Sequence, residues 1–210
     1  MITPSHLFTA GYHDLISVIP PGASLAPGSK IATASLGKVP GHKISERSWA
    51  GFDWRNHNTT EHDVRRWESD GANVGLRAGR FPGLDIDSTD DGIATAVQEL
   101  ALRALGPAPL RVGKPPKRLL MYRTDDPFGR MRMWLEDVKK TTHLIELLGE
   151  GQQYLVFGTH PATMRPYQWS VPELPAAGDL TRITRDKVAA LFDQIAREFG
   201  GRGFTVHREG

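Results

Sequence analysis

Three features of the sequence favour an α+β fold, in which helices pack on a mostly antiparallel sheet. Short apolar runs bounded by Gly, Pro or polar clusters are typical of strands. A few longer segments instead carry their apolar residues at helical spacing. The order in which these strands and helices follow one another favours an α+β arrangement over a doubly wound sheet.

The first third of the chain predicts one strand, a long connection and one helix. The strand is expected around residues 15–19, where an apolar run ends at Pro-Pro-Gly. A stretch rich in Gly, Pro and Ser follows to about Gly51. Thr60 and Asp63, three residues apart, resemble a capping box and predict a helix that begins there.

The rest of the chain predicts two amphipathic helices among several strands. Apolar residues at helical spacing over residues 90–105 predict the first helix, which Gly106-Pro107 ends. A final helix is expected from its N-cap Thr184 through Phe199. A polar linker with Trp134 in its middle is expected between two of the strands. The remaining strands are expected at residues 73–76, 83–87, 118–123, 142–148 and 154–157.

Composition limits the class of protein. With 210 residues, 39% of them hydrophobic, the chain can bury one core and need not form more than one domain. The net charge is only +2, yet its 26 Lys and Arg residues are unevenly placed, which indicates a local basic face. The absence of Cys excludes disulfides, a thiol nucleophile and Cys-type zinc sites.

Neither a membrane nor a secretory location is expected. No apolar run approaches the ~18 residues that would span a bilayer. The first residues lack the charged-then-apolar order of a signal peptide. The sequence therefore predicts a cytoplasmic protein without a membrane partner.

Two aspartates in the segment Gly83-Leu84-Asp85-Ile86-Asp87 are the first candidate for chemistry. In a strand, Leu84 and Ile86 share one face, and Asp85 and Asp87 share the other. Two carboxylates that close repel each other, so a cation between them would stabilise the pair. Mg²⁺ and Mn²⁺ prefer such oxygen ligands. The alternative is that Asp87 only caps the helix that follows.

A basic run, residues 111–118, is the second candidate. Residues 111–123 hold five cations around a Gly and two prolines, and among these Arg111, Lys114 and Lys117 precede an apolar strand. Arg offers forked donors and Lys a compact point charge, so this strand entrance suits a triphosphate or a nucleic-acid backbone. The alternative is a solvated surface loop.

Glu146 is the third candidate. It alternates with Ile145 and Leu147, so in a strand it lies on the face opposite to theirs. An unpaired carboxylate in such an apolar strand would be costly. Its partner is either an arginine, which is the ordinary case, or a metal ion shared with Asp85 and Asp87.

Carboxylates for divalent metals, cations for a triphosphate and a basic surface for a template are the needs of nucleotidyl transfer. In the two-metal scheme one ion activates the attacking 3′-hydroxyl and the other stabilises the departing pyrophosphate. Such a reaction needs neither a cysteine nor a serine nucleophile.

Short motifs in a fixed order run along the chain: Gly37-Lys38-Val39-Pro40, Trp67 with Asn73-Val74-Gly75-Leu76, Leu84-Asp85-Ile86-Asp87, residues 111–117 with Tyr122-Arg123, Ile145-Glu146 before Gly149, and Gly158-Thr159-His160-Pro161 with Tyr167 and Trp169. The ordered set resembles the bifunctional DNA primase/polymerase (prim-pol) domain of the archaeo-eukaryotic primase superfamily, in the form common to phages and plasmids. The resemblance covers about residues 11–169.

This resemblance implies a fold and its division. It implies an RRM-like catalytic sheet with helices, joined to a smaller N-terminal αβ unit. The expected single prim-pol domain, residues 1–210, is then divided into an N-terminal unit at about 1–80, a catalytic unit at about 81–170, and a C-terminal helix and tail at 178–210.

The resemblance also implies site residues. Asp85 and Asp87 match the first acidic motif of the family and Glu146 its third motif, so all three would be catalytic ligands of two Mg²⁺ or Mn²⁺ ions. Many relatives have a Ser and a His two residues apart in the second motif. This chain has no His between Arg111 and Arg123, so we expect cations, Lys117 among them, to replace the imidazole.

The other nucleotide-binding residues are expected around the same region. Arg111 and Lys114 are assigned to the triphosphate with Lys117. His160, in a family-like turn, is assigned to the nucleotide or its sugar, with a purely structural role as the alternative.

The implied function is template-directed synthesis from NTPs or dNTPs in phage or plasmid DNA replication, inside a bacterial cell or a phage-infected host. The expected partners are a single-stranded DNA template and primer, and a replicative helicase, which many relatives carry after this region. Two alternatives remain: a non-catalytic nucleic-acid-binding or replication-initiation module, and a metal-dependent phosphodiesterase, since hydrolysis needs only water in place of the 3′-hydroxyl.

Overall fold

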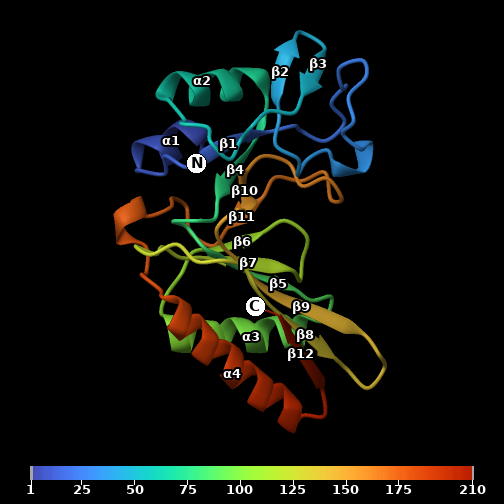
Figure 1. The fold of residues 1–210 in the computed structure, drawn as a ribbon, viewed down its shortest axis with the longest axis vertical. Helices are drawn as coiled ribbons and strands as arrows, with labels where there is room; N and C mark the ends of the chain where they lie inside the picture. The colour runs from blue at the N-terminus through green and yellow to red at the C-terminus, as the bar shows by residue number, and fades with distance from the viewer. Residues whose placement is uncertain (1, 210) are drawn as a thin grey trace.

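A small N-terminal unit stands on a larger sheet that two helices cover, as Figure 1 shows for the computed structural model. The structure describes residues 2–209. Within that range, no helix has the length and apolar character needed to cross a membrane. The mixed helices and antiparallel sheets confirm the expected α+β fold.

The N-terminal unit is built on a three-stranded antiparallel sheet in the order β1-β4-β10. Its strands are β1 (Leu15–Val18), β4 (Asn73–Arg77) and β10 (Gln153–Phe157). Two helices, a 3-10 turn and a hairpin surround this sheet: α1 (Pro4–Thr9), α2 (Glu61–Asp70), η1 (Thr33–Ser35), β2 (His42–Ser45) and β3 (Ser48–Ala50). The hairpin lies inside the stretch that the sequence predicted as a connection, so that prediction was incomplete.

The predicted capping box begins α2. Asp63 donates its backbone N–H to the Thr60 hydroxyl at 3.2 Å, and the Asp63 carboxylate accepts the Thr60 N–H at 3.0 Å. Gly71 ends the helix with a φ of 69°, a left-handed conformation that glycine adopts without strain. Val64 and Trp67 form the buried stripe of α2 and hold it against the sheet.

The large sheet has seven strands in the order β11-β6-β7-β5-β9-β8-β12. They are β5 (Gly83–Asp87), β6 (Leu110–Val112), β7 (Arg118–Met121), β8 (Met131–Glu136), β9 (Thr142–Leu148), β11 (Gln168–Trp169) and β12 (Thr205–Glu209). All of its pairings are antiparallel. The 3-10 turn η2 (Ala177–Asp179) precedes the last helix.

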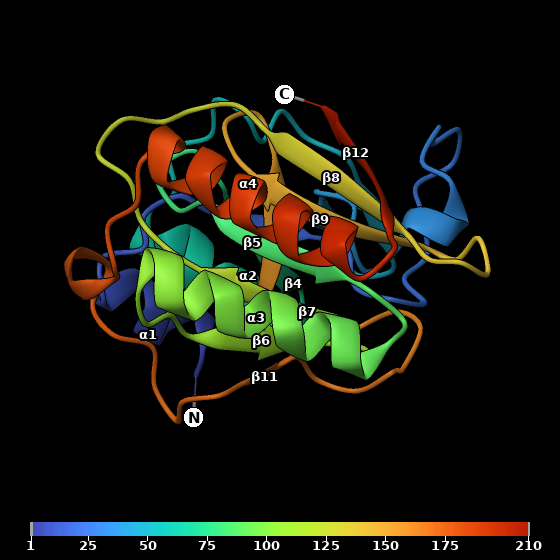
Figure 2. The same cartoon turned by 90° about the horizontal axis from the view of Figure 1, so that it is seen from below.

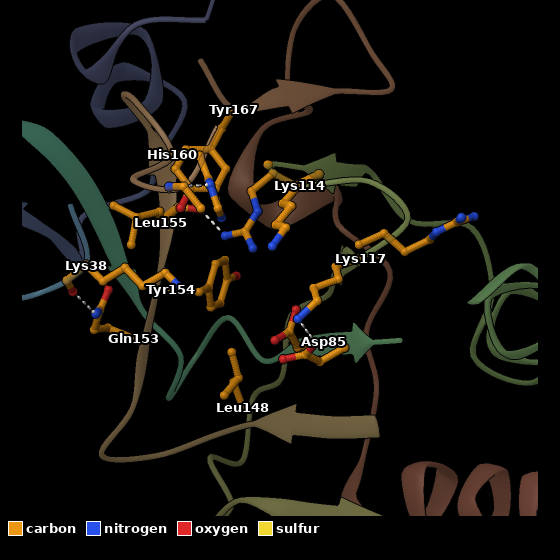
Figure 3. A pocket seen from close by; sticks show the side chains of 15 residues that line it. Lys38, Asp85, Lys114, Lys117, Leu148, Gln153, Tyr154, Leu155, His160 and Tyr167 are labelled. Carbon is orange, nitrogen blue, oxygen red and sulfur yellow. Dashed lines mark hydrogen bonds and ion pairs between the residues drawn. The ribbon is translucent and has the colours of Figure 1, made fainter. Parts of the chain in front are cut away.

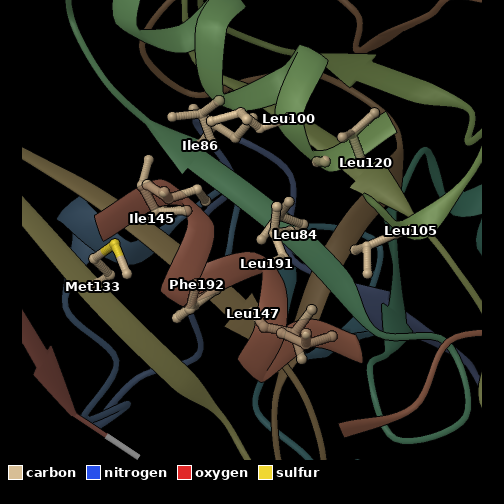
Figure 4. Close-up of a cluster of buried hydrophobic side chains, with 14 of the residues drawn as sticks. Leu84, Ile86, Leu100, Leu105, Leu120, Met133, Ile145, Leu147, Leu191 and Phe192 are labelled. Atoms are coloured by element: carbon tan, nitrogen blue, oxygen red, sulfur yellow. The ribbon is translucent and has the colours of Figure 1, made fainter. Parts of the chain in front are cut away.

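Two helices cover one face of the large sheet. Figure 2 shows α3 (Asp91–Leu105) and α4 (Arg185–Gly201) side by side in front of the strands. Leu84 and Ile86 of β5 have no exposed surface and pack beneath these helices, among the side chains drawn in Figure 4. Because strand side chains alternate, Asp85 and Asp87 lie on the opposite face, as the sequence predicted.

The expectation of a polar linker around Trp134 is wrong. The segment is strand β8, which pairs with β9 along its whole length, and its Met131, Met133 and Leu135 are buried while Arg132, Trp134 and Glu136 are half-buried on the other face. The predicted C-terminal tail likewise ends in β12, which pairs with β8. Arg132 and Glu136 on the half-buried face made the segment look polar, although its apolar residues alternate with a period of two.

Apolar side chains pack across the boundary between the two units. Leu119 and Met121 of β7 pack into the apolar cluster of the N-terminal unit, and β10 belongs to the sheet of that unit. Residues of both sheets also line a pocket where the two units meet. The division near residue 80 stays a prediction.

Candidate active site

A pocket of about 380 Å³ lies where the two units meet, on the face of the large sheet that α3 and α4 leave open. Charged and aromatic side chains from both units dominate its lining. Figure 3 shows it, and its lining residues are Lys38, Asp85, Asp87, Arg111, Gly113, Lys114, Lys117, Arg118, Leu148, Gln153, Tyr154, Leu155, His160, Ala162 and Tyr167.

Asp85 lies on the floor of the pocket. Its position in β5 is flanked by Leu119 of β7 and Glu146 of β9. Burial is the main cause that raises the pKa of the Asp85 carboxyl to about 6; Asp87 and Glu146 contribute to the rise, whereas Arg111 and Lys38 oppose it. A cation beside Asp85 would offset the cost of its burial, so the environment suits a metal ion.

Asp87 points into the same pocket and forms an ion pair with Lys117. The alternative role, capping of the next helix, is wrong. The N-cap of α3 is Asp90, whose Oδ1 accepts the Ile93 N–H at 2.9 Å. Asp87 therefore does not cap α3. A bound cation would compete with Lys117 for the Asp87 carboxylate.

Glu146 lies directly across the strand pair from Asp85, on the same face of the sheet. Its carboxylate Oε1 accepts from Arg132 Nε at 3.0 Å and lies 3.6 Å from Arg130 Nε. Gln152 Nε2 donates to the same oxygen at 3.4 Å. The side chain is only 12% exposed. The ordinary expectation, an arginine partner, is what the structure has, and the role of third metal ligand stays a prediction.

Asp85, Asp87 and Glu146 do not form a three-ligand metal site in the structure. Within residues 2–209, no group of three or more His, Asp or Glu side chains is arranged so that it could hold one. Asp85 and Asp87 line the pocket, whereas Glu146 is turned to its arginines. The two aspartates are the donor pair that fits a divalent cation, and Glu146 is one strand away.

The pKa of Asp85 predicts a measurable effect on stability. Its folded pKa of about 6 exceeds the 3.8 of an unperturbed aspartate. The stabilisation by its proton is therefore complete below about pH 4 and is lost as the pH rises through about 6. The Asp85→Asn variant lacks this loss, so in metal-free buffer the melting temperature of the wild type should fall relative to the variant across this range. Parallel melting curves would contradict the assignment.

The cations of the basic run line the same pocket, and Lys117 lies beside Asp87. Lys114 and Lys117 belong to the turn between β6 and β7, where the Lys117 N–H donates to the Lys114 carbonyl at 3.0 Å. Arg111 lies deeper, with its guanidinium 4.9 Å from the Tyr167 ring centre and donating to the Leu155 carbonyl. The basic run therefore lines a pocket, and Arg111 also holds β6 against β10.

His160 has the structural contacts of the alternative role, and its contact with a nucleotide stays a prediction. Its ring is 9% exposed, and Nδ1 accepts the backbone N–H groups of Ala162 and Thr163 at 3.2 and 3.4 Å. These contacts assign the ring proton to Nε2, which remains a donor. Burial lowers the pKa of His160, and the nearby cations lower it further. The imidazole is therefore a neutral donor in a cationic pocket.

Sequence reasoning did not assign four of the polar and aromatic lining residues. These are Lys38, Gln153, Tyr154 and Tyr167. Lys38 and Tyr167 stand in the motifs quoted above, which was the available signal. Tyr167 packs edge-on against His160 with ring centres 5.4 Å apart, and a Cβ at Gly113 would collide with both rings.

A comparison with protein families adds one finding. Residues 11–180, most of the chain, match the family described as bifunctional DNA primase/polymerase, N-terminal. A comparison with curated proteins finds no match.

Proposed function

Since the chain belongs to the bifunctional DNA primase/polymerase N-terminal family, we propose that its pocket catalyses template-directed nucleotidyl transfer. The observation that carries the proposal is that Asp85 and Asp87 face the same pocket as Lys114 and Lys117. Primase and polymerase chemistry needs this combination of carboxylates for metal ions and cations for phosphates.

We assign Asp85 and Asp87 to the binding of Mg²⁺ or Mn²⁺, two ions in all; Glu146 would be a third ligand if its carboxylate left Arg132. When bound, such ions supply an activated 3′-hydroxyl and neutralise the charge of the departing pyrophosphate. The paired strands fix the backbone positions from which these side chains project, because Asp85 and Glu146 are register neighbours.

The cations then hold the incoming NTP or dNTP. Lys114 and Lys117 act as point charges on the triphosphate, and Arg111 supports them from below. The Nε2–H of His160 donates to the nucleotide. Phosphate oxygens on Lys117 and a metal ion on Asp87 would replace the ion pair that these two side chains form. A single-stranded DNA template and primer, in phage or plasmid replication beside a helicase, complete the proposed setting.

Primer-extension and de novo synthesis assays with labelled nucleotides test this proposal. The purified chain should lengthen a primer in the presence of Mg²⁺ or Mn²⁺ and not in EDTA. Shortening of the strand would instead indicate a phosphodiesterase. DNA binding without any change in the strand would favour a non-catalytic replication module, the reading that the pairing of Glu146 with two arginines supports.

Lys117→Ala should raise the nucleotide KM by about 10- to 100-fold while the affinity for a DNA template changes less, because a lost charge-assisted contact costs about 1.5–3 kcal/mol. Steady-state kinetics and fluorescence anisotropy measure the two effects. Lys139→Ala, an exposed lysine outside the pocket, is the matched control. If template affinity fell by the same factor as KM rose, Lys117 would be a contact to the DNA backbone.

A further inference from the structure

Lys38 reaches the pocket from the N-terminal unit. Its side chain points toward the centre from the side opposite Lys114 and Lys117 (Figure 3). Its positive charge lowers the pKa of both Asp85 and His160, so the ammonium group is within electrostatic reach of each. Lys117 is paired with Asp87, whereas no ion pair within residues 2–209 includes Lys38.

The loop that carries Lys38 is tied down at three points. The Gly37 N–H donates to the Ile19 carbonyl at 2.8 Å. Gln153 Nε2 donates to the Lys38 carbonyl at 2.9 Å. Asn73 Nδ2 donates to the Gly37 carbonyl at 3.2 Å. The backbone beside Lys38 is therefore fixed while its long side chain remains available to a ligand.

Asn73 also fixes the neighbouring loop, which carries His160. Its Nδ2 donates to the Thr159 carbonyl at 2.8 Å, and its Oδ1 accepts the Thr159 N–H at 2.8 Å. Gly158, at a φ of 110°, leaves room for this amide, because a Cβ there would collide with it. Asn73 is 2% exposed and uses both ends of its amide. One buried side chain thus connects two walls of the pocket.

The positions of the cations indicate which ligand fits. Lys114 and Lys117 could hold a single phosphate on their own side. The Lys38 ammonium group on the far side, whose backbone is fixed by hydrogen bonds, could join them on one anion if that anion extends across the pocket. A chain of linked phosphates has that length and charge.

We propose that Lys38 is a polyphosphate-binding residue of the pocket, and that Asn73 positions it by tying the Gly37 and Thr159 loops together. The inference rests on the proposed function, since the natural ligand would be the triphosphate of the incoming nucleotide. Binding of that ligand then bridges the N-terminal unit and the large sheet.

Titration with inorganic tripolyphosphate, without nucleotide or metal, tests Lys38. Isothermal calorimetry should show about a tenfold loss of affinity in Lys38→Ala. Lys30→Ala, an exposed lysine of the same connection that does not line the pocket, should bind like the wild type. Equal affinity in wild type and Lys38→Ala would overturn the inference.

A double-mutant cycle tests the positioning role of Asn73. Asn73→Ala should weaken tripolyphosphate binding in the wild type and weaken it less in Lys38→Ala, with a coupling of at least about twofold. Additive losses would mean that Asn73 acts only on the fold. If Asn73→Ala does not fold, Gln153→Ala, which releases the Lys38 carbonyl at a less buried position, replaces it in the cycle.

These results are separable from the proposed function. A chain that binds tripolyphosphate through Lys38 but synthesises no strand would support this inference and contradict polymerase activity. If the chain extends primers but Lys38→Ala leaves the affinity for tripolyphosphate unchanged, polymerase activity is supported and the role of Lys38 is contradicted.

Discussion

Asp85→Asn should reduce metal-dependent nucleotide incorporation by on the order of a thousandfold or more, and Asp87→Asn should do the same. Each change removes one negative charge and keeps the shape of the side chain, so the metal-binding capacity falls and the packing of β5 does not. Asp85→Asn should fold at least as well as the wild type, because a carboxylate in that buried position is costly.

The measurement is single-turnover primer extension with Mg²⁺ or Mn²⁺ in excess. Glu99→Gln is the matched control, since this exposed carboxylate of α3 pairs with Arg103 at 3.7 Å and lies outside the pocket. The variant Asp85→Asn/Asp87→Asn should be inactive. If it extends primers at the rate of the wild type, the chemistry happens elsewhere.

Glu146→Gln should lower the affinity for Mn²⁺ by about 10- to 100-fold and lower incorporation with it, if Glu146 joins the aspartates around the metal ions. In the structure the same carboxylate is neutralised by Arg132 and Arg130. Metal binding by Glu146 therefore requires that its carboxylate move away from both arginines.

Arg132→Gln separates the two roles of Glu146. Removal of the closest arginine frees the carboxylate, so the affinity for Mn²⁺ should stay the same or rise in this variant while it falls in Glu146→Gln. Titration of Mn²⁺ followed by electron paramagnetic resonance measures both. If neither variant alters Mn²⁺ affinity, Glu146 is a structural partner of Arg132 and the site has two carboxylates.

The parts of the site that sequence reasoning found are those with local signals. The alternation of Asp85 and Asp87 with buried Leu84 and Ile86 is a two-residue period, and the structure has it as predicted. The caps at Thr60 and Thr184 are likewise local patterns, and both are present.

The contacts that the sequence did not predict depend on strand pairing between distant segments. Arg132 lies directly across from Glu146 in the β8–β9 pair. Because β8 was predicted as a polar linker, the partner of Glu146 could not be identified from the sequence. The position of Lys38 depends on contacts with distant segments, among them the bond from Gln153 of β10, which pairs with β4, to the Lys38 carbonyl. No local pattern predicts either contact.

A crystal structure with Mn²⁺ and a non-hydrolysable nucleoside triphosphate gives the most direct test. Anomalous scattering should locate Mn²⁺ between Asp85 and Asp87, with the phosphates on Lys114 and Lys117. Mn²⁺ bound away from both aspartates, or a nucleotide outside this pocket, would contradict the assignment of the site.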